Sequence, residues 1–250
     1  MKMTIFIMNY NWLEWTQKQA AFYTACGHNV IIVDNDSTYP ELLEWYRNCP
    51  YKVLTTAGYK LSCQNRFIWE MGLHDTIEGN YYAVTDSDLG VDNIPSDFAD
   101  LLIDHIEKTP EIIKAGFSLE TNDLPNNRYA SLYKKSETQH IREIDIDGFV
   151  NMPIDTTFAI YSKERCNNLD KLWKKNGEDV PRGANAFLDD RYFYRAHRSP
   201  FPYTAKHMPW YLFINNLNKE QLFHIQNAVH GSLNVFKNLY KEELKERYGI

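Results

Sequence analysis

The sequence has no long apolar run and few cysteines, and each shortage excludes a class of protein. None of its apolar segments approaches the roughly 20 residues that a membrane-spanning helix needs. No signal-peptide pattern precedes the first predicted strand. The four cysteines, Cys26, Cys49, Cys63 and Cys166, show no Cys-x-x-Cys spacing and no dense framework, so we expect reduced cysteines that act as small hydrophobic residues. These absences predict a cytoplasmic protein without a transmembrane segment, although contact with a membrane surface stays open.

Positive charge is also in short supply. The 250 residues hold 27 Lys and Arg against 33 Asp and Glu, a formal net charge of −6. A nucleic-acid-binding domain is typically basic, so no nucleic-acid partner is expected. The hydrophobic fraction of 44% and the charged fraction of 24% are those of ordinary globular proteins. Because no linker or repeat interrupts the chain, we expect one domain over residues 1–250.

Glycine-rich phosphate loops are missing as well. The turn after the first predicted strand, MNYNW at residues 8–12, contains no glycine, so the dinucleotide-binding fingerprint fails. The sequence has no P-loop, no Gly-x-Ser-x-Gly nucleophile elbow and no His-Glu-x-x-His metal motif. An enzyme with this sequence must build its site from acidic side chains.

What the sequence does contain is a regular alternation of strand and helix patterns. Strands are predicted at residues 4–8, 29–33, 51–54, 81–84, 112–119 and 154–161. Helices are predicted at 12–26, from Pro40 through Tyr46, at 61–74, and from Pro95 through Ile106 to just before Pro110. This alternation predicts an α/β fold with a mostly parallel central sheet flanked by helices. The second half is less regular, with a helical patch at 133–141, a charged loop at 167–186 and a helical tail from residue 219. We interpret the charged run at 241–247 as a solvated helix face.

The strongest functional pattern is TDSD at residues 85–88, directly after the fourth predicted strand. In an extended segment residues i and i+2 point the same way, so Asp86 and Asp88 could face one divalent cation. Mg²⁺ and Mn²⁺ favour such oxygen ligands. A chance Asp-x-Asp in an acidic loop is one alternative. A calcium loop that includes Asp92 is another, but Gly90 stands one residue too early for it.

A second polar cluster, VDNDST at residues 33–38, follows the second predicted strand. Ligands of parallel sheets bind beyond the carboxyl ends of the strands, where both clusters fall. Asp34 at the strand end could accept from a base N–H or from ribose hydroxyls. The alternative is an Asx-turn leading into the helix at Pro40, which suits Asp36 and Ser37.

Taken in order, these acidic strand ends resemble those of GT-A glycosyltransferases of the family 2 type. Further segments resemble a bacterial and viral branch of these enzymes, namely PELLEWY (40–46), SLETNDLP (118–125), PIDTTFAIY (153–161) and HMPWYL (207–212). The resemblance covers residues 3–217. It implies a single GT-A (Rossmann-like) domain with a nucleotide-sugar-binding half (1–120), an acceptor and catalytic half (121–217) and a helical tail (218–250).

The resemblance also implies a nucleotide-sugar donor, most often UDP-linked, bound through Mn²⁺ or Mg²⁺. Carried over by position, Asp34 with Asn35 would bind the nucleoside, Asp86 the ribose or the metal, and Asp88 the metal. Arg66 would contact the diphosphate or an acid, although a structural ion pair is equally plausible there.

His207 is the candidate for a late metal ligand, because many GT-A enzymes close their metal site with a C-terminal histidine. The nearby cations Lys206, Arg195 and Arg198 could neutralise a departing diphosphate. His197 competes with His207 for the same role.

An inverting transferase needs a carboxylate that accepts the proton of the acceptor hydroxyl. Asp155 is the first candidate, and the adjacent pair Asp189 and Asp190 competes with it. The alternative for the pair is a structural role, either as a helix cap or in an ion pair with Arg191. A retaining enzyme would need no such base, and the sequence leaves that open.

The sequence therefore favours a metal-dependent transferase that moves a sugar to a glycan, lipid-linked or small-molecule acceptor, as in polysaccharide biosynthesis. One alternative is a nucleotidyltransferase, although the glycine-rich loop typical of that class is absent at residues 9–12. The other is a sugar- or calcium-binding module without catalysis. Donor sugar, acceptor, linkage and oligomeric state are not predicted.

Overall fold

The structure is a computed structural model that describes residues 1–59, 67–139, 143–145, 147–167 and 195–250. The strands are β1 (Thr4–Asn9), β2 (Asn29–Asp34), β3 (Lys52–Thr55), β4 (Tyr81–Asp86), β5 (Leu89–Gly90), β6 (Lys114–Leu119), β7 (Glu143–Ile144), β8 (Val150–Asn151), β9 (Ala159–Ser162) and β10 (Ala196–His207). The helices are α1 (Glu14–Ala25), α2 (Pro40–Asn48), α3 (Phe67–Glu70), α4 (Phe98–Lys108), α5 (Arg128–Thr138), α9 (Lys219–Asn227), α10 (Gly231–Leu239) and α11 (Lys241–Tyr248), with 3₁₀ turns η2 (Leu73–Thr76) and η3 (Met208–Tyr211).

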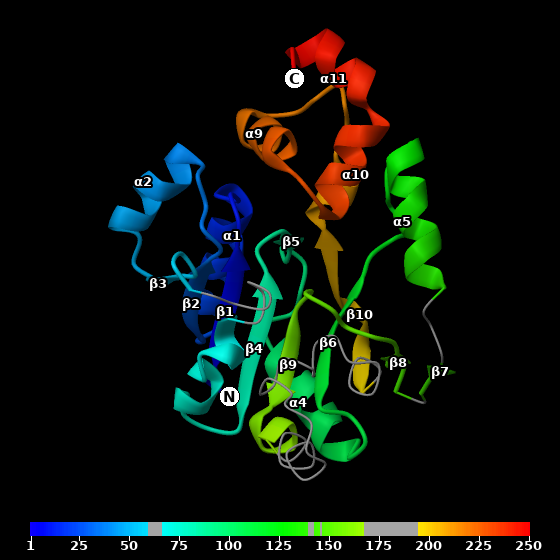
Figure 1. Cartoon of the computed structure of the whole chain (residues 1–250). Coiled ribbons are helices and arrows are strands. Elements are labelled where there is room, and N and C mark those ends of the chain that lie inside the picture. The colour runs from blue at the N-terminus through cyan, green and yellow to red at the C-terminus, as the bar shows by residue number, and fades with distance from the viewer. Residues whose placement is uncertain (60–66, 140–142, 146, 168–194) are drawn as a thin grey trace, which may run out of the picture.

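A mixed sheet forms the centre of the molecule (Figure 1). Within the described residues its strand order is β3-β2-β1-β4-β9-β6-β10-β8-β7, and β5 pairs with β10. β1 runs parallel to β2 and β4, and β6 runs parallel to β10. β9 is antiparallel to both of its neighbours, β4 and β6. The predicted α/β fold with a mostly parallel sheet is confirmed, and the antiparallel strand β9 lies between β4 and β6.

Both faces of the sheet are covered, which explains why β1 appears in the sequence as a continuous apolar run. Ile5 and Ile7 pack on one face with side chains of α1 and α4, whereas Phe6 and Met8 pack on the other face with α3. Strands buried on both faces need no alternation of polar residues. The apolar segments thus place β1 at the centre of the sheet, between β2 and β4.

Three predicted elements differ from those observed. The helix expected at 61–74 is reduced to α3 and η2, separated by Gly72 in the left-handed conformation (φ 66°), and residues 60–66 lie outside the described part. The helical patch expected at 133–141 begins earlier, because the Asn127 side chain caps α5 by accepting from Ala130 N–H. The strand expected at 154–161 forms only as β9, and its first residues turn instead toward the end of β4. The charged loop at 167–186 lies outside the described residues apart from Asn167.

The C-terminal helices pack against the first turn of α1, above the carboxyl ends of β1 and β4 (Figure 1). Their apolar side chains, among them Ile225 and Phe236, form a cluster with Trp12 and Trp15. Leu244 is the buried residue of α11, and most charged residues of that helix are exposed, which confirms a solvated face for residues 241–247. The tail is therefore packed onto the sheet end where ligands are expected to bind.

Two further observations concern the described residues alone. None of their helices is long and apolar enough to cross a membrane. Cys26, Cys49 and Cys166 are free thiols, and Cys63 lies outside the described part.

Candidate active site

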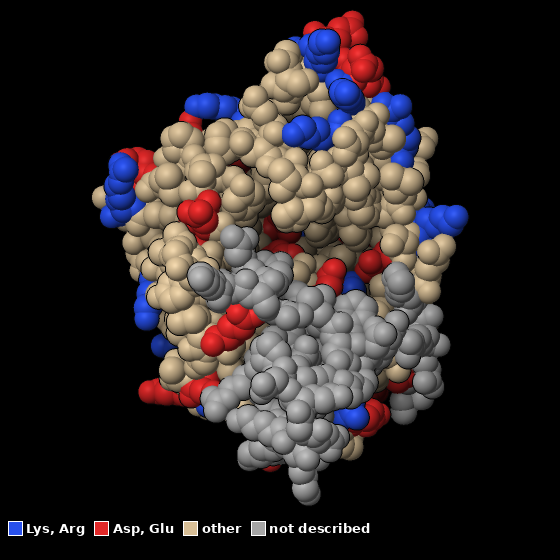
Figure 2. All heavy atoms as spheres, in the orientation of Figure 1, with Lys and Arg blue, Asp and Glu red and all other residues tan. Residues whose placement is uncertain are grey.

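A cavity of about 470 Å³ lies at the carboxyl ends of β1, β2 and β4. Its walls come from Tyr10 and Trp12 after β1, from Asn35 and Asp36 after β2, and from residues 86–88 after β4. Residues 227–233, from the last residue of α9 to the first turn of α10, line it together with His224. In Figure 2, acidic side chains lie in the hollow below the C-terminal helices. The cavity is thus where a parallel sheet is expected to bind a ligand.

Three hydrogen bonds to backbone atoms hold the acidic turn after β4. Ser87 N–H donates to Met8 C=O (3.1 Å), and Asp86 N–H donates to Thr156 C=O (2.9 Å). The Gln19 side chain donates to Asp86 C=O (3.0 Å). Because the chain turns here instead of continuing as a strand, the position of Asp88 depends on β5, which pairs with the end of β10.

This turn gathers negative charge away from solvent. Burial raises the pKa of Asp86, and the charges of Asp88 and Asp155 raise it further. Burial also raises the pKa of Asp88, which the neighbouring Asp155 charge raises further and His207 lowers. Buried carboxylates that repel one another are costly unless a cation compensates them. The arrangement therefore favours a bound positive charge.

His207 lies beside Asp88. The register of β5 and β10 sets His207 opposite Leu89, which leaves 3.7 Å between His207 Nε2 and Asp88 Oδ1. Asp88 Oδ1 and His207 Nδ1 are both buried, and neither has a hydrogen-bond partner in the described part of the chain. Imidazole nitrogen and carboxylate oxygen suit Mn²⁺, and an orphaned carboxylate oxygen fits a divalent cation.

Asp86, Asp88 and His207 do not form a closed protein cage. Among the described residues, the group whose three ligand atoms lie within 4.8 Å of one another is a different one, His105, Asp145 and His197. An open set of one or two carboxylates is typical of Mg²⁺ and Mn²⁺ sites that complete their coordination with water and substrate phosphates. The competing candidate, His197, lies in that other group, near the start of β10.

The end of β2 differs from the prediction for Asp34. Its carboxylate is buried and accepts from Ser37 N–H (3.0 Å) and from the Tyr46 hydroxyl (3.1 Å). Asp34 therefore builds the turn that was assigned to Asp36 and Ser37, while Asn35 and Asp36 line the cavity. A carboxylate at the end of a strand can accept hydrogen bonds from backbone N–H groups of the residues that follow, and this explains the turn at Asp34.

Two of the predicted cations also have structural partners. Lys206 pairs with Asp123 and lies 3.8 Å from Glu120. Arg198 is buried, 2.6 Å from Glu137, and also donates to Pro153 C=O. It lies near the start of β10, whereas His207 ends the same strand. Neither Lys206 nor Arg198 lines the cavity. The candidates Arg66, Asp189 and Asp190 lie outside the described residues.

Asp155 is exposed and lies in the turn before β9, close enough to raise the pKa values of both Asp86 and Asp88. A fully buried lysine lies nearby: Lys114 Nζ donates to Ile154 C=O (2.5 Å). Burial lowers the pKa of Lys114 to about 7, and the Asp155 charge opposes that shift. The sequence pattern did not indicate Lys114, because it occupies an ordinary position in a strand.

The C-terminal wall is the part of the site that sequence reasoning missed. His224 is buried against the Trp12 ring, with centroids 4.3 Å apart, and burial lowers its pKa to about 3, so it is neutral. Asn227, His230 and Ser232 join it in lining the cavity. The polar segment between α9 and α10, with Gly231 in the left-handed conformation, was the available signal.

We expect Glu220→Ala to loosen this wall. Glu220 of α9 accepts from Leu13 N–H (2.5 Å) and Glu14 N–H (3.2 Å), so it caps a helix that has no cap of its own. Hydrogen bonds to a charged acceptor contribute about 2 kcal/mol, and the free energy of unfolding should fall by that amount. Urea denaturation measures it, with Glu246→Ala as the matched exposed control. An equal effect of both substitutions would contradict the capping role.

No protein-family model matches the sequence, and no curated protein matches it. Solved structures do match. The mannosyltransferase PcManGT from Pyrobaculum calidifontis, in complex with GDP-Man and Mn²⁺, is 14% identical with a TM-score of 0.48 over 90% of this chain and 60% of its own. S. aureus TarS (residues 1–349) is 13% identical with a TM-score of 0.43 over 99% and 73%.

A third match is the glucosyl-3-phosphoglycerate synthase of Mycobacterium tuberculosis in complex with Mn²⁺, UDP-glucose and glycerol 3-phosphate. It is 12% identical with a TM-score of 0.42 over 74% of this chain and 68% of its own. The chain thus spans 60% of the length of the Pyrobaculum protein. The resemblance to glycosyltransferases extends to these structures as a distant likeness of fold.

Proposed function

We propose that the protein is a metal-dependent glycosyltransferase that uses a nucleotide-sugar donor. The observation that carries this proposal is the Asp88–His207 pair: His207 Nε2 lies 3.7 Å from Asp88 Oδ1, and Asp88 Oδ1 is buried with no hydrogen-bond partner among the described residues. Asp88 of this pair lines the cavity at the carboxyl ends of the parallel strands. A divalent cation would compensate the charge of the acids, and the oxygens of a bound diphosphate would complete the coordination of that cation.

The size and lining of the cavity support a nucleotide. About 470 Å³ lies within the range of small-ligand sites. The rings of Tyr10 and Trp12 offer apolar surface for a base, and Asn35 and Asp36 offer polar groups for the base or the ribose. The donor we propose is a UDP-sugar, with the nucleoside toward the ends of β1 and β2 and the diphosphate toward Asp88.

Each group has a distinct role in this proposal. Asp88 and His207 would hold Mn²⁺ or Mg²⁺, with Asp86 beside them. When bound, the ion supplies Lewis-acid stabilisation of the diphosphate leaving group. Asp155, exposed at the edge of the acidic cluster, would accept the proton of the attacking hydroxyl in an inverting reaction. The acceptor would be a glycan, a lipid-linked sugar or a small molecule.

Calorimetric titration with UDP, with and without Mn²⁺, tests the proposal. We expect UDP to bind at least about tenfold more tightly with Mn²⁺, because the cation bridges the acids and the diphosphate. A variant in which exposed Asp92 is replaced by asparagine is the control and should bind like the natural sequence. Absence of UDP binding in both conditions would refute a UDP-sugar donor. Metal-dependent binding without transfer from any UDP-sugar would instead favour a binding module.

A further inference from the structure

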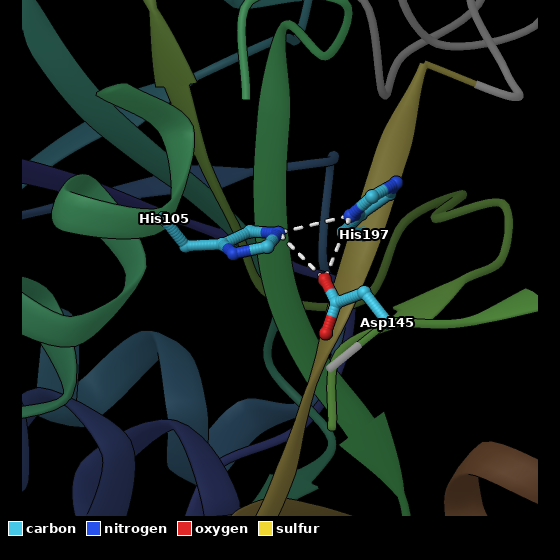
Figure 3. A group of neighbouring side chains, drawn as sticks. All are labelled: His105, Asp145 and His197. Atoms are coloured by element: carbon cyan, nitrogen blue, oxygen red, sulfur yellow. Dashed lines mark hydrogen bonds and ion pairs between the residues drawn. The ribbon is translucent and has the colours of Figure 1, made fainter. Parts of the chain in front are cut away.

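A second cluster of ligand-type side chains lies at the opposite end of β10 from His207. His105 is in the last turn of α4, His197 is the second residue of β10, and Asp145 is in the hairpin between β7 and β8 (Figure 3). His105 Nε2 and His197 Nδ1 are hydrogen-bonded to each other at 2.9 Å, and Asp145 Oδ2 lies 3.8 Å from both nitrogens. Three segments far apart in the sequence thus point one ligand atom each at the same place.

The carboxylate is oriented before any ion arrives. Asp145 Oδ1 accepts from Asp147 N–H (3.0 Å) and Phe149 N–H (2.9 Å), and these bonds turn Oδ2 toward the two imidazoles. His105 is fixed as well, because its ring stacks on the Phe149 ring with centroids 3.6 Å apart and planes 2° from parallel. In metal sites, supporting residues orient the ligands through hydrogen bonds and packing of this kind.

The spacing of these groups suits a small transition-metal ion. A tetrahedral ion with bonds of about 2.0–2.1 Å holds its ligand atoms roughly 3.3 Å apart, between the observed 2.9 and 3.8 Å. The side chains of both histidines are close to buried, whereas that of Asp145 is about one-third exposed (31%), so an ion can enter from the carboxylate side.

We propose that His105, His197 and Asp145 bind a divalent transition-metal ion of the Zn²⁺ class, with water as the fourth ligand. The two imidazoles disfavour Mg²⁺ and Ca²⁺, which take oxygen ligands. The ion joins the β7–β8 hairpin to α4 and β10, so its role is structural. This site is separate from the proposed donor site, because β10 runs from His197 near its start to His207 at its end.

Zinc titration of the full, chelator-treated chain by calorimetry tests this assignment, with excess Mg²⁺ present to compete at the acidic site. We expect one zinc ion to bind to the natural sequence and also to Asp88→Asn. His197→Gln and Asp145→Asn should each weaken zinc binding by at least about 100-fold, because loss of a ligand exceeds the 10- to 100-fold cost of losing a supporting residue. Zinc should also raise the melting temperature of the natural sequence.

Asp145→Asn keeps an Oδ1 acceptor for the two backbone bonds, so this variant retains the hairpin. Its melting temperature without zinc verifies that it is folded. Asp104→Asn, one residue from His105 and exposed, is the matched control and should bind zinc normally. The assignment is overturned if the natural sequence binds no zinc, or if His197→Gln and Asp145→Asn both bind it with unchanged affinity. Loss of zinc binding in Asp88→Asn alone would assign the ion to the acidic site and overturn it too.

Discussion

Replacing Asp88 with asparagine should reduce sugar transfer by about 10³-fold while making the metal-free protein equally stable or more stable. The loss follows from removal of a ligand to the cation, since Lewis-acid stabilisation of a leaving group is worth several kcal/mol. The gain follows from the removal of a buried charge. Burial and the Asp155 charge both raise the pKa of Asp88, so its ionised form is disfavoured in the metal-free fold.

A loss of activity without a loss of stability would distinguish removal of a metal ligand from misfolding of the variant. Transfer rates from a UDP-sugar and melting temperatures without metal are the two measurements. Mn²⁺ should raise the melting temperature of the natural sequence more than that of Asp88→Asn, because only the natural sequence keeps the Asp88 ligand at the acidic site. Asp92→Asn changes an exposed acid in the same segment and should leave both quantities unaltered. Full activity in Asp88→Asn would remove the basis of the proposed function.

The sequence predicts the parallel half of the fold well because the signal there is local. Apolar runs such as residues 4–8 and 81–84 become β1 and β4, and turn-forming residues mark where they end. The insertion of β9 between β4 and β6 is not local. It depends on pairing between residues about 80 positions apart, such as Tyr81 with Ser162, and no periodicity within either segment reports it.

The residues of the candidate site likewise differ in whether a local sequence pattern indicates them. Asp86 and Asp88 were predicted as metal ligands because two acids follow a buried strand. His207 was predicted as one of two candidate histidines, and the two lie at opposite ends of β10. For Asp34 the local sequence pattern is ambiguous. A carboxylate that ends a strand and one that binds a ligand have the same sequence pattern, and only its bonds to Ser37 and Tyr46 distinguish them.

Gly116 is a residue whose importance the sequence conceals. It lies in β6, paired with Ala159 of β9, and its backbone conformation does not require glycine. A Cβ atom there would lie 2.0 Å from Phe158 C=O and 3.0 Å from Ile154 Cδ1. The first neighbour is backbone and cannot rotate away. Glycine is therefore required by the close approach of the turn that leads into β9.

We expect Gly116→Ala to lower the free energy of unfolding by about 3 kcal/mol, because β9 and the turn before it must shift. That turn carries Asp155, and its Thr156 C=O accepts from Asp86 N–H. The shift should therefore also weaken Mn²⁺-dependent UDP binding in the fraction that remains folded. Urea denaturation and calorimetry measure the two effects.

Gly90→Ala is the informative comparison, because the new methyl group would meet the flexible Met208 side chain at 2.8 Å rather than backbone. Met208 can change rotamer, so the loss of stability should be smaller than for Gly116→Ala. Equal losses would show that side-chain crowding alone sets the cost at both positions. A folded Gly116→Ala protein with unchanged UDP binding would mean that the turn before β9 does not position the acidic cluster. Asp155 would then lose its structural link to the proposed metal site.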